Sequence, residues 1–121
     1  MSSIPDELFG RWLLTTFNGL DLSDQGYQPC SMSLEPSGDR VEIFIEIVNI
    51  MSGTLEYRDG TLTGPLISTM IAGEGLLEGI EEAFAAGIEA GMEVLIEEAT
   101  MTFSQGGNTF FFVAQPDSAQ Q

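Results

Sequence analysis

The sequence predicts an α+β domain in which a small antiparallel sheet curls into a partial β-barrel, closed by one amphipathic helix at about residues 74–91. The first observation is that segments with a two-residue alternation of apolar and polar side chains occur on both sides of a single segment with a 3.6-residue period. The second is that Asn-Gly and Asp-Gly pairs separate some of these segments, and such pairs favour tight turns between antiparallel strands.

The first half of the chain predicts three strands. Residues 9–19 alternate and end in Asn18-Gly19, which indicates a strand that runs into a turn. Residues 21–30 are rich in Asp, Ser, Gly and Pro and are predicted to be a loop. A short strand follows at residues 30–36, and a long strand runs from Val41 to Ile50.

The long strand has one apolar face, which we expect to be interior. Its members by two-residue periodicity are Val41, Ile43, Ile45, Ile47, Asn49 and Met51. The other face becomes apolar toward Ile50, so we expect another element to cover that end. Because interior amides must be hydrogen-bonded, we predict that the Asn49 side chain bonds to neighbouring backbone where the strand turns or bulges.

The second half of the chain predicts a hairpin at Asp59-Gly60, another strand within residues 65–73, and two or three strands within residues 93–115. A further turn is expected at Gln105 to Asn108. The chain length fits one domain, which we place at residues 5–116, followed by a disordered tail at 117–121.

The predicted helix has an apolar arc and an acidic arc. The apolar arc contains Leu76, Leu77, Ile80, Phe84, Gly87, Ile88 and Gly91, and the acidic arc contains Glu74, Glu78, Glu81, Glu82 and Glu89. Each glycine in a helix costs about 1 kcal/mol relative to alanine. Gly87 and Gly91 lie in the apolar arc, so we expect them to let the helix approach the sheet closely.

The composition excludes many kinds of chemistry. The chain has no lysine and no histidine, which excludes Ser-His-Asp and Cys-His nucleophiles, Schiff-base chemistry, histidine metal sites and the P-loop lysine. Residues 21–32 begin like a calcium loop, but Met32 stands where a bidentate glutamate is needed. Adjacent carboxylates such as Glu81 and Glu82 do not face each other as a glycosidase pair must. We therefore predict no enzymatic activity, catalytic residue, cofactor or metal.

The net charge of −16 also bears on partners and location. An acidic surface repels nucleic acid, so no nucleic-acid partner is expected. No run approaches the roughly 18 apolar residues of a membrane span. With a single cysteine, Cys30, no intrachain disulfide can form, and the N-terminus lacks a signal-peptide pattern, so we expect a cytoplasmic protein.

Two surfaces are candidates for binding. The first is an acidic face for an unknown, basic protein partner, formed by Glu74, Glu78, Glu82, Glu89 and Glu93, and its alternative interpretation is a solvated face. The second is an apolar crevice between helix and sheet for a lipid or other apolar ligand, formed by Phe44, Val48, Ile50 and Phe84, and its alternative interpretation is ordinary core.

Several motifs, in order, resemble the META domain family. The opening strand has Gly-x-Trp at Gly10 and Trp12 before its Asn-Gly turn, and a later segment keeps Asn49, Ser52, Gly53 and Tyr57 but has Ile47 and Val48 where the family has Gly-Cys. "STMIAG", with Thr69, is similar to the family's Ser-Thr-x-Met segment, and a Glu-rich helix with Glu81 and Phe84 follows.

The resemblance implies a small barrel-like α+β fold with no established enzymatic activity. The family includes bacterial envelope proteins linked to heat shock and antibiotic tolerance, and trypanosomatid proteins linked to infectivity and virulence. We therefore expect a non-catalytic interaction module associated with infectivity or secretory traffic in a parasite, near the secretory route or flagellar pocket. The alternative is a carrier, because the family fold resembles secretin pilotins, which bind lipid tails.

Overall fold

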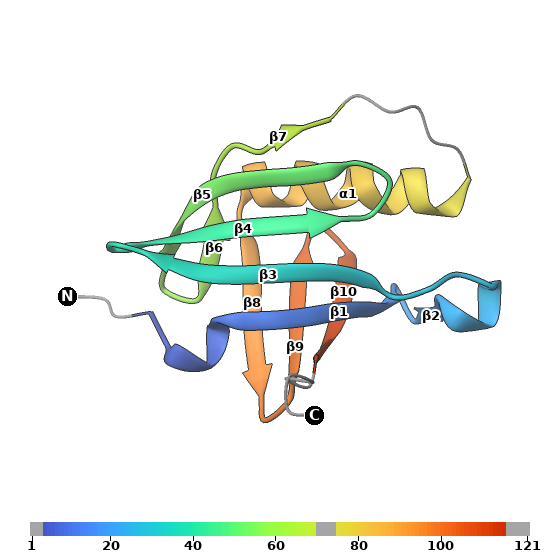
Figure 1. The fold of residues 1–121 in the computed structure, drawn as a ribbon, viewed down its shortest axis with the longest axis horizontal. Helices are drawn as coiled ribbons and strands as arrows, with labels where there is room; N and C mark the ends of the chain where they lie inside the picture. The colour runs from blue at the N-terminus through green and yellow to red at the C-terminus, as the bar shows by residue number, and fades with distance from the viewer. Residues whose placement is uncertain (1–3, 70–74, 116–121) are drawn as a thin grey trace, which may run out of the picture.

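Eight antiparallel strands form a closed barrel in the computed structural model, which describes residues 4–69 and 75–115 (Figure 1). Around the ring the order is β1 (Gly10–Phe17), β3 (Cys30–Ser37), β4 (Arg40–Glu46), β5 (Ile50–Arg58), β6 (Thr61–Thr63), β8 (Met92–Glu97), β9 (Thr100–Gln105) and β10 (Asn108–Ala114). β10 then pairs with β1, so the predicted partial barrel is in fact closed.

Closure depends on the first and last strands of the chain. Trp12 pairs with Ala114 at one end of this ladder and Phe17 with Phe110 at the other, with a bulge between Leu14 and Thr16. Next to the Phe17–Phe110 end of the ladder, the Asn18 side chain stabilises the pairing by accepting a hydrogen bond from the Thr109 backbone N–H at 2.7 Å. These partners lie about ninety residues apart in sequence, which is why local periodicity did not predict the closure.

Two further strands lie outside the ring. β2 (Leu20–Asp21) pairs with the end of β1, and β7 (Ile67–Ser68) pairs with β5. Short 3-10 helices occur at Asp6–Leu8 and Ser23–Gln25. The predicted strand at residues 65–73 is thus reduced to β7 among the described residues, and residues 70–74 and the predicted tail lie outside them.

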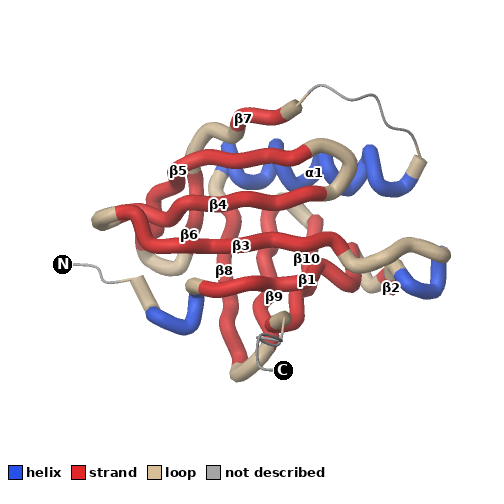
Figure 2. Tube along the Cα trace, viewed as in Figure 1, coloured by secondary structure: helices blue, strands red, loops and turns tan. Residues whose placement is uncertain are grey.

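The helix α1 (Leu76–Ala90) packs against β6, β8 and β9 and lies across the adjoining ends of β8 and β9 (Figures 1 and 2). The prediction of one helix here is confirmed, although Glu74 lies outside the described residues and Gly91 follows the helix. Its predicted apolar arc does face the core, since Ile80, Phe84, Gly87 and Ile88 are buried.

Aromatic packing joins the helix to the barrel interior. Phe84 is fully buried, and its ring centroid lies 5.3 Å from that of Phe110 and 6.0 Å from that of Phe103. Gly87 faces Met92, and a Cβ at Gly87 would lie 2.8 Å from the Met92 methyl carbon. The helix therefore docks closely where glycine removes the side chain, as its position in the apolar arc predicts.

The predicted long strand from Val41 to Ile50 is wrong, because the chain turns at residues 47–49 and divides it into β4 and β5. The predicted interior face nevertheless persists through the turn. Val41, Ile43, Ile45, Ile47, Asn49 and Met51 are all buried. A two-residue alternation thus continues across a tight connection, which is why periodicity alone could not detect the turn.

The three predicted turns are confirmed. Asn18-Gly19 and Asp59-Gly60 have positive φ angles at both positions, 53° and 80° in the first pair and 53° and 79° in the second. Gly106 and Gly107 provide the same left-handed geometry between β9 and β10. Such turns match the twist of the strands that they connect.

Candidate functional site

One row of side chains crosses the outside of five neighbouring strands. Cross-strand pairing aligns Ile67 of β7 with Ser52 of β5, Ser52 with Phe44 of β4, Phe44 with Ser33 of β3, and Ser33 with Arg11 of β1. We call these five residues the outer row. Paired residues in a sheet project from the same face, so large side chains alternate with serines along the row.

The outer row carries exposed apolar surface. Phe44 is 54% exposed and Ile67 is 76% exposed, and Ile50, which pairs with Glu46 beside Phe44, is 47% exposed. These are three of the four large apolar side chains that are exposed in the described part of the chain; the fourth is Leu95 on β8. The outer row therefore concentrates apolar surface on one face of the barrel.

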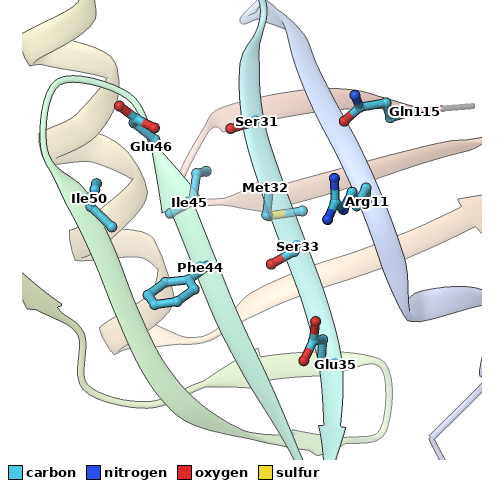
Figure 3. A pocket seen from close by; sticks show the side chains of 10 residues that line it. All are labelled: Arg11, Ser31, Met32, Ser33, Glu35, Phe44, Ile45, Glu46, Ile50 and Gln115. Carbon is cyan, nitrogen blue, oxygen red and sulfur yellow. The ribbon is translucent and has the colours of Figure 1, made fainter. Parts of the chain in front are cut away.

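A hollow of about 450 Å³ lies on the same face (Figure 3). β3 contributes Ser31 and Ser33 to it, while Phe44 and Ile50 stand on one side and Arg11 on the other. The small serine side chains on β3 produce a depression in the surface between the larger side chains of the neighbouring strands. The hollow is thus a direct consequence of serines at alternate positions on the outer face of one strand.

The charge around the hollow is mainly negative. Glu35 and Glu46 line it, and Glu42, which pairs with Glu35, is also exposed on the outer face. Arg11 is the arginine at the hollow, whereas Arg40 and Arg58 both contact Glu56, at 3.3 and 3.7 Å. Three carboxylates against one guanidinium give this surface a net negative charge.

A hydrogen-bonded network joins the β4–β5 turn to the helix and to the segment after β7. Glu81 Oε1 accepts the backbone N–H groups of Val48, at 2.8 Å, and Asn49, at 2.6 Å, and Glu81 Oε2 accepts Asn49 Nδ2 at 2.7 Å. Thr69 Oγ1 donates to Asn49 Oδ1 at 2.8 Å and accepts the Ile50 N–H at 3.2 Å.

Asn49 is buried and has a structural role, as its interior position predicts. The predicted bond partner is corrected, because its side chain bonds to the side chains of Glu81 and Thr69 in distant segments, whereas the sequence predicted neighbouring backbone. Glu81 is the residue that sequence reasoning misplaced, because we assigned it to the solvated acidic arc. On a helical wheel it lies only about 20° beyond Ile88, at the border of the apolar arc. This position at the border of the apolar arc is the sequence feature that could have indicated that the Glu81 carboxylate points toward the protein and not toward solvent.

The other motif residues have structural positions. Trp12 is buried and its indole N–H donates to the Leu8 carbonyl oxygen at 3.1 Å. A Cβ at Gly53 would collide with the Pro65 carbonyl oxygen, so this position requires glycine. Gly10 has a φ of 134°, which favours glycine, and Tyr57 packs against the core. Ser52 is the exception, because it lies in the outer row.

The predicted acidic face is only partly continuous. Glu78, Glu82 and Glu89 lie on α1, with Glu78 half-buried and the other two exposed. Glu93 does not continue the helix, because it lies on β8, where it pairs with Thr61 and Ser104. The helix ends at Ala90, with Gly91 as its C-cap, so Glu89 and Glu93 do not share a helix face.

The predicted apolar crevice is not formed by the four residues assigned to it. Phe84 lies in the barrel core, fully buried, whereas Phe44 and Ile50 project from the outer face of the sheet. Val48 is half-buried in the β4–β5 turn. The sheet itself separates Phe84 from Phe44, because Phe44 alternates with the buried Ile43 and Ile45 on β4 and so projects to the outer face, whereas Phe84 packs in the interior.

The described residues offer little reactive chemistry. Burial, helped by the carboxylates of Glu46 and Glu81, raises the pKa of the Cys30 thiol to about 11, so the thiol is un-ionised at neutral pH. Hydrogen bonds from the Ser23 hydroxyl and N–H lower the pKa of the exposed Asp21. Across residues 4–69 and 75–115, no group of three Cys, Asp or Glu side chains could hold a metal ion.

Within the same described segments, no helix is long and apolar enough to cross a membrane. The fold and the site together define a small closed antiparallel barrel with one docked helix and an exposed apolar row on its outer face. The family model of the META domain matches residues 6–117. The chain therefore belongs to the META domain family, as its sequence motifs indicate.

A solved structure described as "NMR structure of the protein" is also similar to this chain, with a TM-score of 0.73. The match covers 88% of this chain and 90% of that one at 20% sequence identity. At this identity the likeness supports the fold and not a shared activity. A search of the curated proteins finds no match.

Proposed function

We propose that this META-domain protein is non-catalytic and acts by binding another protein through the outer row. The observation that carries the proposal is the exposure of Phe44 and Ile67 in one row, beside Ile50, whereas most other large apolar side chains of the described residues are buried or half-buried. Exposed apolar side chains that gather on one face mark interaction sites in soluble proteins.

The surroundings of the row support a specific contact. Aromatic residues in a contact centre contribute much of the binding energy when a pocket beside them admits a partner side chain. Phe44 stands next to the hollow over Ser31 and Ser33, so both parts are present. A rim of Glu35, Glu42 and Glu46 favours a basic partner.

Affinity capture from the cells that produce the protein tests this proposal. Three tagged forms are compared by quantitative mass spectrometry: the wild type, Phe44→Ser with Ile67→Ser, and Leu95→Ser. Leu95 is the matched control, because it is 58% exposed but lies on β8, away from the outer row. We expect a partner to be lost with the double variant and retained with the control.

A partner that is retained equally by all three forms would contradict a role for the outer row. The acidic helix face remains a second proposed docking surface and has its own arm in the experiment. Glu78→Lys with Glu82→Lys reverses two helix carboxylates while leaving the outer row intact. If the partner is lost only with this variant, the partner binds the acidic helix face and not the outer row.

Two further parts of the proposal come from the sequence, the first from family resemblance and the second from family resemblance together with the single cysteine. These are an association with infectivity or secretory traffic in a parasite, and a cytoplasmic location near the secretory route. Endogenous tagging followed by imaging checks both, since the same tagged protein reports its location and its captured partner. A nuclear location would contradict this setting.

A further inference from the structure

We infer that the outer row binds an amphipathic helix of a partner protein, with basic side chains on both flanks of the helix's apolar stripe. This inference depends on the proposed function and adds the chemistry of the partner. It comes from the order of side chains along the row: large at Ile67, small at Ser52, large at Phe44, small at Ser33 and large at Arg11.

The spacing of the serines matches a helix. Ser52 and Ser33 lie two strands apart, and neighbouring strands are about 4.8 Å apart, so the two gaps are separated by about 9.6 Å. A helix rises 1.5 Å per residue, so side chains seven residues apart are separated by about 10.5 Å. A helix laid across the strands thus places two apolar side chains into the two gaps.

An extended segment laid across the strands fits less well. Side chains on one face of an extended chain repeat every two residues, or about 6.7 Å. That repeat falls between one strand spacing, about 4.8 Å, and two strand spacings, about 9.6 Å. If one side chain of the extended segment entered the gap at Ser33, the next would therefore not align with the gap at Ser52. The gaps on either side of Phe44 therefore favour a helix over an extended segment.

The charges specify the flanks of the bound helix. Glu46 lies on one side of the row, where it pairs with Ile50, and Glu35 and Glu42 pair with each other on the other side. Lysine or arginine on each flank of a partner helix would reach these carboxylates. With a net charge of −16, a second copy of this chain is an unfavourable occupant, because like charges repel.

Binding of designed peptides to the full chain tests the inference. The main probe is a peptide of about 18 residues with leucines along one helical stripe and lysines on both flanks, long enough to form a helix on contact. One comparison peptide has glutamate for each lysine, and another has a central proline, which breaks the helix. Calorimetry gives the affinity, and circular dichroism reports the helix content of the bound peptide.

Three variants locate the contact on the protein. Ser33→Tyr fills one gap with a residue that strands accept, so it blocks insertion without removing apolar surface. Phe44→Ser removes the large side chain between the gaps. Glu35→Gln with Glu46→Gln removes two rim charges, and Glu7→Gln with Glu97→Gln is its control, because both pairs change the net charge equally and Glu7 and Glu97 are exposed elsewhere.

We expect the leucine-lysine peptide to bind with a gain in helix content and the other two peptides to bind far more weakly. Ser33→Tyr and Phe44→Ser should each weaken binding about tenfold or more. Glu35→Gln with Glu46→Gln should weaken it about three- to tenfold, and the control pair should match the wild type. Thermal melting of each variant shows that it is folded.

Three results would overturn the inference: no binding of the leucine-lysine peptide, equal binding to every variant, or binding of the proline peptide as tightly as the parent peptide. Equal binding to every variant would mean attraction to the general acidic surface. None of these results decides the proposed function, since cellular capture that depends on Phe44 and Ile67 tests it separately. Failure of both experiments would exclude the outer row altogether.

Discussion

The carboxylate of Glu81 accepts three N–H groups from the β4–β5 turn, two from the backbone of Val48 and Asn49 and one from the Asn49 side chain. Glu81 lies on the helix and Asn49 between two strands of the barrel, 32 positions earlier in the chain. This pair attaches the helix to the sheet at the point where the chain reverses beside the outer row. It therefore links the stability of the fold to the placement of Ile50.

Asn49→Ala should lower the free energy of unfolding by about 1 to 3 kcal/mol, because it removes a hydrogen bond to the half-buried Glu81 carboxylate and another from the Thr69 hydroxyl. Chemical denaturation of Asn49→Ala, Glu81→Ala and the double variant measures the coupling between the two residues. We expect the double variant to lose clearly less than the sum of the single losses. Glu82→Gln is the control, since Glu82 is exposed on the same helix, and additive losses would refute the pairing.

Phe84→Ala should destabilise the protein by about 3 to 5 kcal/mol, because it empties a fully buried site between three aromatic rings. Phe44→Ala should change the free energy of unfolding by no more than about 0.5 kcal/mol, because Phe44 is exposed. Urea denaturation of the two variants distinguishes core from surface. A similar loss in both would mean that the two phenylalanines share one packed environment.

Two glycines should respond in opposite directions to alanine. At Gly53 a Cβ collides with the Pro65 carbonyl oxygen, so Gly53→Ala should lower the melting temperature by several degrees. Gly79 lies in α1 with no heavy atom within 4 Å of a built Cβ, so Gly79→Ala should stabilise the protein by about 0.5 to 1 kcal/mol. Calorimetric melting of both variants checks the pair, and a destabilised Gly79→Ala would contradict the described helix surface.

Cys30 should make stability depend on alkaline pH. Burial and the carboxylates of Glu46 and Glu81 raise its pKa from an ordinary value of 9.0 to about 11. Between these two values the unfolded chain loses the thiol proton while the folded chain keeps it, so this contribution is complete below pH 9 and is lost as the pH rises toward 11. The expected loss is on the order of 2 to 3 kcal/mol.

Denaturation at pH 8.5 and pH 11 compares the wild type with Cys30→Ala, which removes the titrating thiol. The wild type should lose more stability over this interval than the variant, because the two proteins differ in the Cys30 thiol and share every other ionisable group. Equal losses would show that the folded thiol ionises at its ordinary pKa.

The turns and the helix could be predicted because their signals are local. Asn18-Gly19 and Asp59-Gly60 adopt left-handed geometry through their own backbone preferences, and the apolar arc around Phe84 repeats within a single helix. The alternation of interior residues from Val41 to Met51 is also a local pattern. The burial that it predicts is confirmed, even though the chain turns at residues 47–49. The acidic surface likewise follows from composition.

The tertiary structure decided which distant residues meet. Pairing of β1 with β10 closes the barrel, and Glu81 reaches Asn49 because the docked helix lies beside the β4–β5 turn. The outer row exists only because five strands align Ile67, Phe44 and Arg11 in register. Such contacts depend on strand register and helix docking over long sequence separations, whereas the periodicity of a sequence reports only the immediate neighbours of each residue.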